Sequence, residues 1–206
     1  MSLLVDTRHI HTLKNDFTGI CLFVGIIWLV FLLDQFIPFL PFERLGLVPR
    51  EMRGLDGILT MPFLHKDFSH LLSNTVPLII TLLLLTGSRA NSTFIVVATV
   101  LLGGALLWVF GREARHIGAS GLVFGLIAFH IAFGFFEKRL RSIAIAIVVG
   151  LLYSSTLLQG ILPLQSGVSW DGHLLGAVAG GLIAFAVAQD PGTTSSTGSR
   201  GSSRSV

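Results

Sequence analysis

Six long apolar runs constrain the fold of this 206-residue chain more than any other feature of its sequence. The runs cover approximately residues 17–37, 70–87, 93–110, 120–136, 142–159 and 169–188. A helix needs roughly 17 to 25 predominantly apolar residues to cross a bilayer. Only 12% of the residues are charged, whereas a soluble domain has about a quarter. The sequence therefore predicts an all-α membrane protein with one compact bundle of six transmembrane helices.

Polar segments flank the predicted bundle, which spans residues 17–188. We expect residues 1–16 to form a cytoplasmic polar leader and residues 189–206, rich in Gly, Ser and Thr, to form a disordered tail. The first apolar run ends in Asp34 and Gln35 without a small-residue cleavage site, which indicates a retained anchor and not a signal peptide. The long connection 38–69 alternates apolar and charged residues, as is typical of a segment lying in the membrane interface.

The basic residues indicate the orientation of the chain. The net charge is +3, but Lys and Arg lie in short loops beside the spans, so positive-inside bias explains them better than nucleic-acid binding does. With the N-terminus inside, eight Lys and Arg residues lie on the inner side and six on the outer side. We expect a multi-pass protein of the cell membrane, from its size a bacterial plasma membrane, with a cytoplasmic N-terminus. The single cysteine, Cys21, excludes an internal disulfide, and no cofactor or metal ion is predicted.

Polar residues recur where the second, fourth and sixth spans begin. They are His70 and Asn74, then Ser120, then His173. In an alternating bundle these three starts lie on one face of the membrane, the outer face in this orientation. Each residue lies within about one turn of its helix start, at a rise of ~1.5 Å per residue. Ionisable groups inside a membrane are costly and mark functional sites, so we expect these side chains to converge.

Small residues predict that the fourth and sixth spans pack closely. Gly172, Gly176 and Gly180 follow an i, i+4, i+8 pattern, and Gly121 and Gly125 form a similar stripe. Such stripes let helix backbones approach each other in membranes. The glycines alone are equally consistent with packing and no further role.

The convergent groups suit nucleophilic catalysis. A serine hydroxyl needs a neighbouring base, most often a neutral imidazole, so Ser120 and His173 form a candidate dyad. Asp171 is expected to point to a different side of its helix, which leaves no acid for a triad. The N–H groups at the start of the fourth span, including that of Ser120, together with His70 and Asn74 could form an oxyanion hole. Taken singly, these residues could instead be a helix cap, interhelical glue and structural histidines.

Other protease chemistries lack their residues. The chain contains no HExxH motif and no GxGD motif, and its lysines all lie in polar flanks, where they cannot serve a Ser-Lys dyad. GASG is not a GxSxG elbow, and no strand precedes it.

Three motifs resemble those of the rhomboid family of intramembrane serine proteases. They are HLLSN at 70–74, GASG at 118–121 and GHLLG at 172–176, and the resemblance covers residues 17–188. It implies a six-helix rhomboid-like bundle. Its implied roles are nucleophile for Ser120, base for His173, oxyanion contacts for His70 and Asn74, packing on the base for Phe124, and support from Gly118, Gly121 and Gly176.

The resemblance also implies a function and a loop architecture. The function is endopeptidase cleavage of membrane-protein substrates in or next to their transmembrane segments. The first loop is expected to be embedded in the membrane, and residues 160–168 to form a mobile cap over the site. Family members often carry a Trp-Arg pair in the first loop, but this loop has no tryptophan, and Arg53 is one candidate for the arginine. His65 is expected to be structural, and His130 to lie too deep for catalysis.

Two rival functions agree less well with the sequence. A catalytically inactive relative that binds membrane proteins is disfavoured because both Ser120 and His173 are present. A transporter with a pocket at the polar helix starts should have paired broken helices, and the sequence gives no sign of them. The substrate and the oligomeric state are not predicted.

Overall fold

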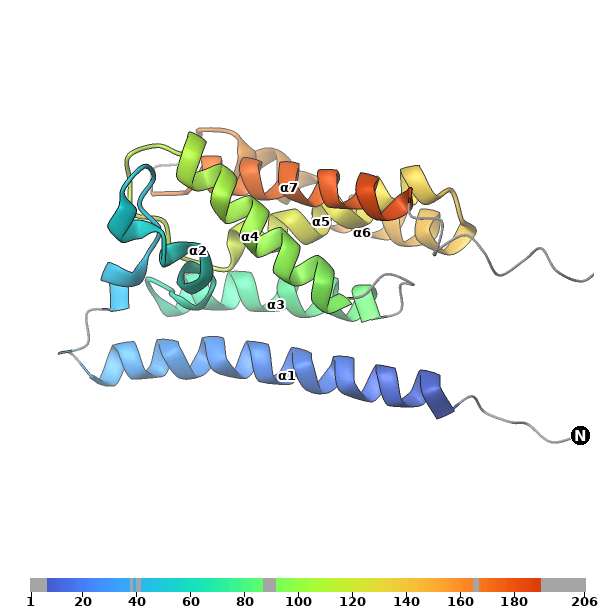
Figure 1. Ribbon diagram of the computed structural model, residues 1–206, viewed down its shortest axis with the longest axis horizontal. Helices are drawn as coiled ribbons and strands as arrows, with labels where there is room; N and C mark the ends of the chain where they lie inside the picture. Colours follow the sequence, from blue (N-terminus) through green and yellow to red (C-terminus); the bar gives the residue numbers. More distant parts are fainter. Residues whose placement is uncertain (1–6, 38, 40–41, 87–91, 165–166, 190–206) are drawn as a thin grey trace, which may run out of the picture.

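The computed structural model describes residues 7–37, 39, 42–86, 92–164 and 167–189 (Figure 1). Six of its helices are long and apolar enough to cross a membrane. They are α1 (Thr7–Phe36), α3 (Phe68–Thr86), α4 (Ser92–Phe110), α5 (Ser120–Glu137), α6 (Leu140–Ile161) and α7 (Trp170–Ala188). The apolar spans end within two residues of the predicted limits, so the prediction of an all-α, multi-pass membrane protein is confirmed.

Helix α1 begins before the membrane span. Its apolar part is Asp16–Phe36, in agreement with the predicted span 17–37, and its helical backbone already begins at Thr7, within the predicted polar leader 1–16. No proline or glycine interrupts the chain before Asp16, so the helix continues beyond the apolar run. The predicted tail lies outside the described residues except for Gln189.

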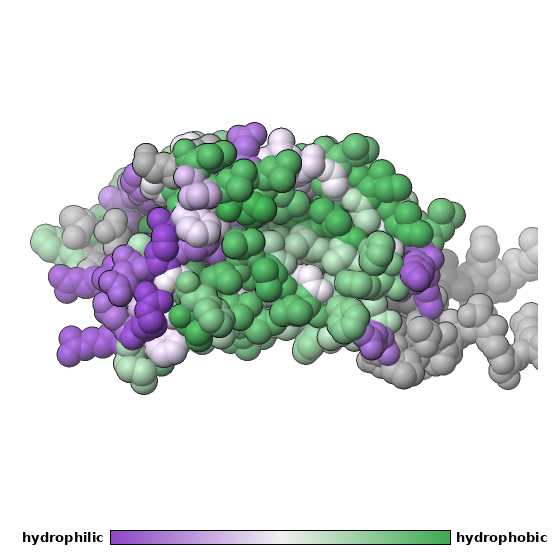
Figure 2. Space-filling model, turned by 90° about the horizontal axis from the view of Figure 1, so that it is seen from above, coloured by the Kyte–Doolittle hydropathy of each residue, from purple (hydrophilic) through white to green (hydrophobic). Residues whose placement is uncertain are grey.

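Helix α5 forms the centre of the bundle. It packs most extensively against α7, then against α6, and also contacts α3 and α4, whereas α1 lies alongside α3 at the edge (Figure 1). Leu126, Ile127 and Phe129 on α5 are fully buried. The outer faces of the other helices expose large apolar side chains, which form a hydrophobic surface with hydrophilic residues gathered at its two ends (Figure 2). This surface is the one expected to face lipid.

The connection between α1 and α3 is folded. It contains three 3-10 turns, η1 (Phe42–Leu45), η2 (Met52–Gly54) and η3 (Met61–Phe63), and the short helix α2 (Gly57–Thr60). Leu47 and His116 exchange two backbone hydrogen bonds of 3.0 and 2.8 Å, which join this first loop to the α4–α5 connection. Leu47 is fully buried against Met61 and Leu107. Some of the apolar residues in the segment 38–69 therefore form the small core of a folded loop.

Arg50 attaches the first loop to the end of α4. Its backbone N–H donates to Trp108 O at 3.0 Å, and its guanidinium donates to Gly111 O at 2.7 Å. The Trp108 indole in turn donates to Glu51 O at 3.0 Å. Arg53, the arginine considered from sequence, is exposed and makes no hydrogen bond or ion pair with any part of the chain that is described. The first loop is thus held by Arg50, three residues before Arg53, and by Trp108 on α4.

Candidate active site

Ser120 is the first residue of α5, and the turn before it is fixed from two sides. The Gly118 N–H donates to Met61 O at 2.8 Å, and the Ala119 N–H points at His65 Nε2 at 3.5 Å. Gly118 has a φ of +113°, which favours glycine. A Cβ at this position would also lie 2.8 Å from His70 Nε2 and 3.8 Å from Ser120 Oγ. Glycine at 118 therefore lets the His70 ring lie next to the serine turn.

His173 is the fourth residue of α7, and its ring is held on two sides. Nδ1 lies 2.9 Å from Gly160 O. A carbonyl oxygen can only accept, so Nδ1 carries the proton and Nε2 has a free lone pair. The Phe124 ring stacks on the imidazole with centroids 4.1 Å apart and an interplanar angle of 9°. The ring is thus placed by α5 and α6, and its tautomer is the one that a general base requires.

Glycines let α5 and α7 touch backbone to backbone. A Cβ on Gly176 would overlap Gly121 O and lie 2.9 Å from the Gly121 carbonyl carbon. One turn deeper, a Cβ on Gly180 would overlap Gly125 O. Phe124, which stacks on His173, follows Ser120 by one turn of α5. This crossing therefore brings the His173 ring beside the turn of α5 that begins with Ser120.

Ser120 and His173 line one cavity of about 770 Å³. His70, Asn74 and Phe124 also line it, so the structure brings together all the side chains assigned to catalysis from sequence. Within the described residues, no hydrogen bond joins the Ser120 hydroxyl to His173. Such bonds commonly tighten only in the substrate complex. Polar side chains, among them those of Lys66, Arg115 and Gln159, also line the cavity.

His70 and Asn74 face the cavity from α3. The His70 N–H is capped by Asp67 Oδ1 at 2.8 Å, which fixes the first turn of this helix. Asn74 is buried, and its amide nitrogen donates to His70 O at 2.9 Å. An asparagine amide carries two N–H groups, so one donor is left for another acceptor.

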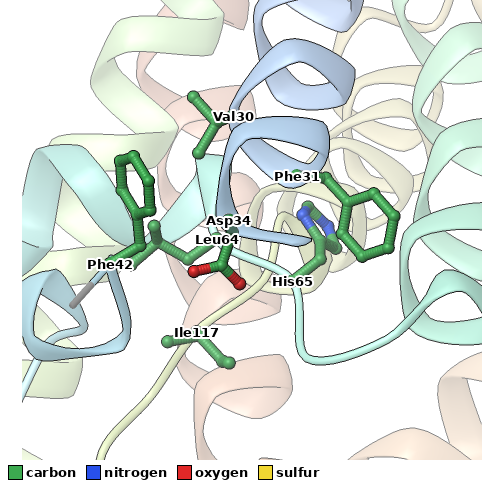
Figure 3. A pocket seen from close by; sticks show the side chains of 7 residues that line it. All are labelled: Val30, Phe31, Asp34, Phe42, Leu64, His65 and Ile117. Carbon is green, nitrogen blue, oxygen red and sulfur yellow. The ribbon is translucent and has the colours of Figure 1, made fainter. Parts of the chain in front are cut away.

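Two further histidines are buried away from the Ser120–His173 cavity. His65 is 4% exposed and lines a small cavity with Phe31, Asp34 and Leu64 (Figure 3). Burial, reinforced by the neighbouring His70, lowers the pKa of His65 to about 4, so its ring is neutral at pH 7. His130 is buried in α5, with Nε2 3.0 Å from Thr81 O on α3. Among the residues that the structure describes, no cluster of three or more His, Cys, Asp or Glu could hold a metal ion.

The sequence did not reveal the hydrogen-bond partners of Asp171 or of the His173 ring. The Asp171 carboxylate accepts from the Arg112 N–H at 2.8 Å and from its guanidinium at 3.1 Å, while His173 Nδ1 bonds to Gly160. Gly160 is also spatially required, since a Cβ there would overlap the Phe124 ring and lie 3.1 Å from His173 Nδ1. A main-chain carbonyl leaves no motif in a sequence, so residue identity alone could not predict this contact.

Comparison with known proteins decides the family. A family model described as Rhomboid domain matches residues 53–190, which include every site residue named above. The chain belongs to the rhomboid family. Rhomboid family members are in general intramembrane serine proteases.

This rhomboid chain has relatives in mycobacteria. Uncharacterized proteins of Mycobacterium tuberculosis and Mycobacterium bovis are each 39% identical to it over 181 residues, which cover 82% of this chain and 73% of the relative. An uncharacterized protein of Mycobacterium leprae is 35% identical over 173 residues, covering 79% of this chain and 68% of the relative. No solved structure matches this rhomboid.

Proposed function

We propose that this rhomboid is a serine endopeptidase that hydrolyses peptide bonds in or next to transmembrane segments of membrane-protein substrates. The observation that carries the proposal is the way in which the His173 ring is held in place. Gly160 O and the Phe124 ring hold the imidazole with Nε2 unprotonated, on the wall of the cavity that Ser120 also lines. A base in the correct tautomer that shares a cavity with a serine is the arrangement that acyl transfer needs.

The reaction follows from these positions. Ser120 Oγ attacks the substrate carbonyl carbon while His173 Nε2 takes the hydroxyl proton. The imidazolium then gives this proton to the leaving nitrogen, the C–N bond breaks, and an ester to Ser120 remains. Water entering through the cavity loses a proton to His173 and attacks the ester carbon. The imidazolium then returns that proton to Ser120 Oγ as the ester C–O bond breaks, which regenerates the hydroxyl and releases a carboxylic acid product.

The tetrahedral intermediates need donors for their oxyanion. The Ser120 N–H is one of the first N–H groups of α5, which have no acceptor within the helix. The side chains of His70 and Asn74 line the same cavity. We assign these three groups to the oxyanion hole, where loss of one donor typically lowers kcat by about 10²–10³-fold.

The cellular setting is part of the proposal. We place the chain in the bacterial plasma membrane, as its mycobacterial relatives suggest, with residues 17–188 as the protease domain. Positive-inside bias puts the N-terminus in the cytoplasm and the cavity toward the outer face. The partners are transmembrane substrates and the lipid bilayer, without a nucleic acid or a cofactor.

Cleavage of a fluorescent transmembrane substrate in proteoliposomes tests the function. We expect the wild type to cleave, Ser120→Ala to give only background, and His173→Ala to be at least ~100-fold slower. Ser73→Ala is the matched control, because Ser73 lines the same cavity but donates to His70 O of its own helix. Equal cleavage by all four proteins would refute the dyad. Substrate binding without cleavage by the wild type would favour an inactive relative.

A further inference from the structure

A second polar cluster lies where the α4–α5 connection meets the start of α7, and two of its members, His116 and Ser169, also line the cavity. Its centre is Asp171, whose side chain is only 5% exposed. Arg112 donates to this carboxylate from both its N–H and its guanidinium. The guanidinium also donates to Val168 O at 3.2 Å and lies over the Trp170 ring, 5.3 Å from the centroid. Arg112 therefore contacts both the first turn of α7 and Val168, the residue before Ser169.

His116 and Ser169 complete the cluster. His116 is 3% exposed, and its Nδ1 lies 2.7 Å from Ser169 Oγ. Its Nε2 lies 3.3 Å from Arg112 O and 3.8 Å from Asp171 Oδ2. The Ser169 hydroxyl also reaches Asp171 Oδ1 at 3.4 Å. We call Arg112, His116, Ser169 and Asp171 the anchor cluster.

Charge makes the arrangement of the anchor cluster specific. A buried carboxylate is costly unless it is paired and hydrogen-bonded, and removal of one partner is far more damaging than removal of both. Burial lowers the pKa of His116 despite the nearby Asp171, so the ring is neutral at pH 7. Arg112 is then the cation that balances Asp171. The carboxylate is satisfied only when α7 starts in this position relative to Arg112.

Short covalent paths lead from the anchor cluster to both proposed catalytic residues. On one side, His116 precedes Ser120 by four residues, and its backbone is held by Leu47. On the other side, Ser169 O accepts the His173 N–H at 3.0 Å. Gly172 leaves room for the Ser169 hydroxyl, since a Cβ there would lie 2.5 Å from Ser169 Oγ.

We propose that Asp171 is a positioning residue for the peptidase reaction. Through Arg112 and Ser169 it fixes the first turn of α7 against the connection that carries Ser120, and so sets the reach of His173 to the serine hydroxyl. This inference rests on the proposed function. It differs from a triad, because Asp171 acts through the backbone and not through the imidazole.

The test measures how fast Ser120 reacts in variants of the anchor cluster. The probe is a fluorophosphonate, which labels an activated serine, and substrate cleavage gives kcat and KM in parallel. We expect Asp171→Asn to lower the labelling rate and kcat by 10- to 100-fold with KM unchanged. Arg112→Ala should have a similar effect, and the double variant Arg112→Ala, Asp171→Asn should be no slower than Arg112→Ala alone. Glu113→Gln is the control, because it also removes an acidic charge next to Arg112 in the sequence, but Glu113 is 87% exposed and its ion-pair partner is Arg50, at 3.7 Å, outside the anchor cluster.

Thermal unfolding of each variant separates positioning from structural support. All rates are measured well below the unfolding midpoint of the weakest variant, where every protein is folded. Lower midpoints with wild-type labelling and kcat would overturn the inference, as would additive losses in the double variant. Where Asp171→Asn does not fold, Arg112→Ala decides alone, because the Arg112 side chain is half exposed and its N–H remains. Labelled wild type with unlabelled Ser120→Ala upholds the proposed function whatever the Asp171 result, whereas an unlabelled, inactive wild type overturns both.

Discussion

The contact between Gly176 on α7 and Gly121 on α5 supports a prediction whose size follows from the structure. In Gly176→Ala the new Cβ would overlap Gly121 O and lie 2.9 Å from the Gly121 carbonyl carbon, at least 0.5 Å short of the 3.4 Å at which ordinary contact begins. Both partners are backbone atoms, so no side-chain rotation can relieve the overlap. The two helices have to separate by roughly 1 Å at this level, given the backbone overlap.

This separation has two measurable costs. Overpacking of a tight contact typically destabilises by about 1–3 kcal/mol, and the better helix propensity of alanine offsets at most about 1 kcal/mol of it. Activity should fall more steeply, because a misplacement of ~1 Å between reacting groups can lower the rate by about 100-fold. Ser120 directly precedes Gly121, and His173 lies about one turn before Gly176 on the facing helix, so the two residues separate with this contact.

Gly181→Ala is the matched control. It makes the same substitution on the same helix with the same gain in propensity, but a Cβ at Gly181 meets no atom within 4 Å among the residues the structure describes. The assay is kcat/KM for a transmembrane substrate in proteoliposomes, with thermal unfolding in detergent for stability. Gly176→Ala activity within about twofold of Gly181→Ala would refute the claim that backbone contact between α5 and α7 sets the catalytic geometry.

Two further predictions concern residues outside the cavity. The pKa of His65 lies near 4 in the folded protein and near 6.5 in the unfolded chain, so protons bind the unfolded state first and stability falls as pH drops from about 6.5 to 4. The free energy of unfolding should be about 2 kcal/mol lower at pH 5 than at pH 7.5 because of this histidine. His65→Gln should lack this part of the pH dependence, and parallel pH profiles for the variant and the wild type would contradict the prediction. Arg50→Ala removes the guanidinium bond to Gly111 O and should lower the free energy of unfolding by about 1 kcal/mol. Arg53→Ala is the control and should leave it unchanged, so equal unfolding midpoints for the two variants would contradict a role of Arg50 in holding the first loop.

The spans and their order could be predicted because lipid imposes a length and an apolar composition on each helix. Alternation of the helices then placed Ser120 and His173 at one end of the bundle without any knowledge of packing. The i, i+4 glycines pointed to close packing of α5 and α7, because only small residues allow backbones to meet in a membrane. These inferences all use features carried by residue identity.

Contacts made through the main chain could not be predicted in this way. Gly160 holds His173 by a carbonyl, and Leu47 holds His116 by its backbone groups. The partner of Asp171, Arg112, lies in a loop whose path depends on the first loop, so spacing gave no register for the pair. The contact between Trp108 and the first loop could not be predicted either, because this tryptophan belongs to α4 and lies far from the loop in the sequence.

The bond from His173 Nδ1 to Gly160 O gives the imidazole an orienting group that no side-chain deletion can remove. In a triad the orienting carboxylate is lost by a single substitution, and the ring can then change tautomer. Here the acceptor is a peptide oxygen, so every residue type at position 160 retains it, and substitutions act only by shifting α6 or crowding the ring. The protonation pattern of the base therefore depends on the position of the α6 backbone, and it is lost only when α6 is displaced or the ring is crowded out of place.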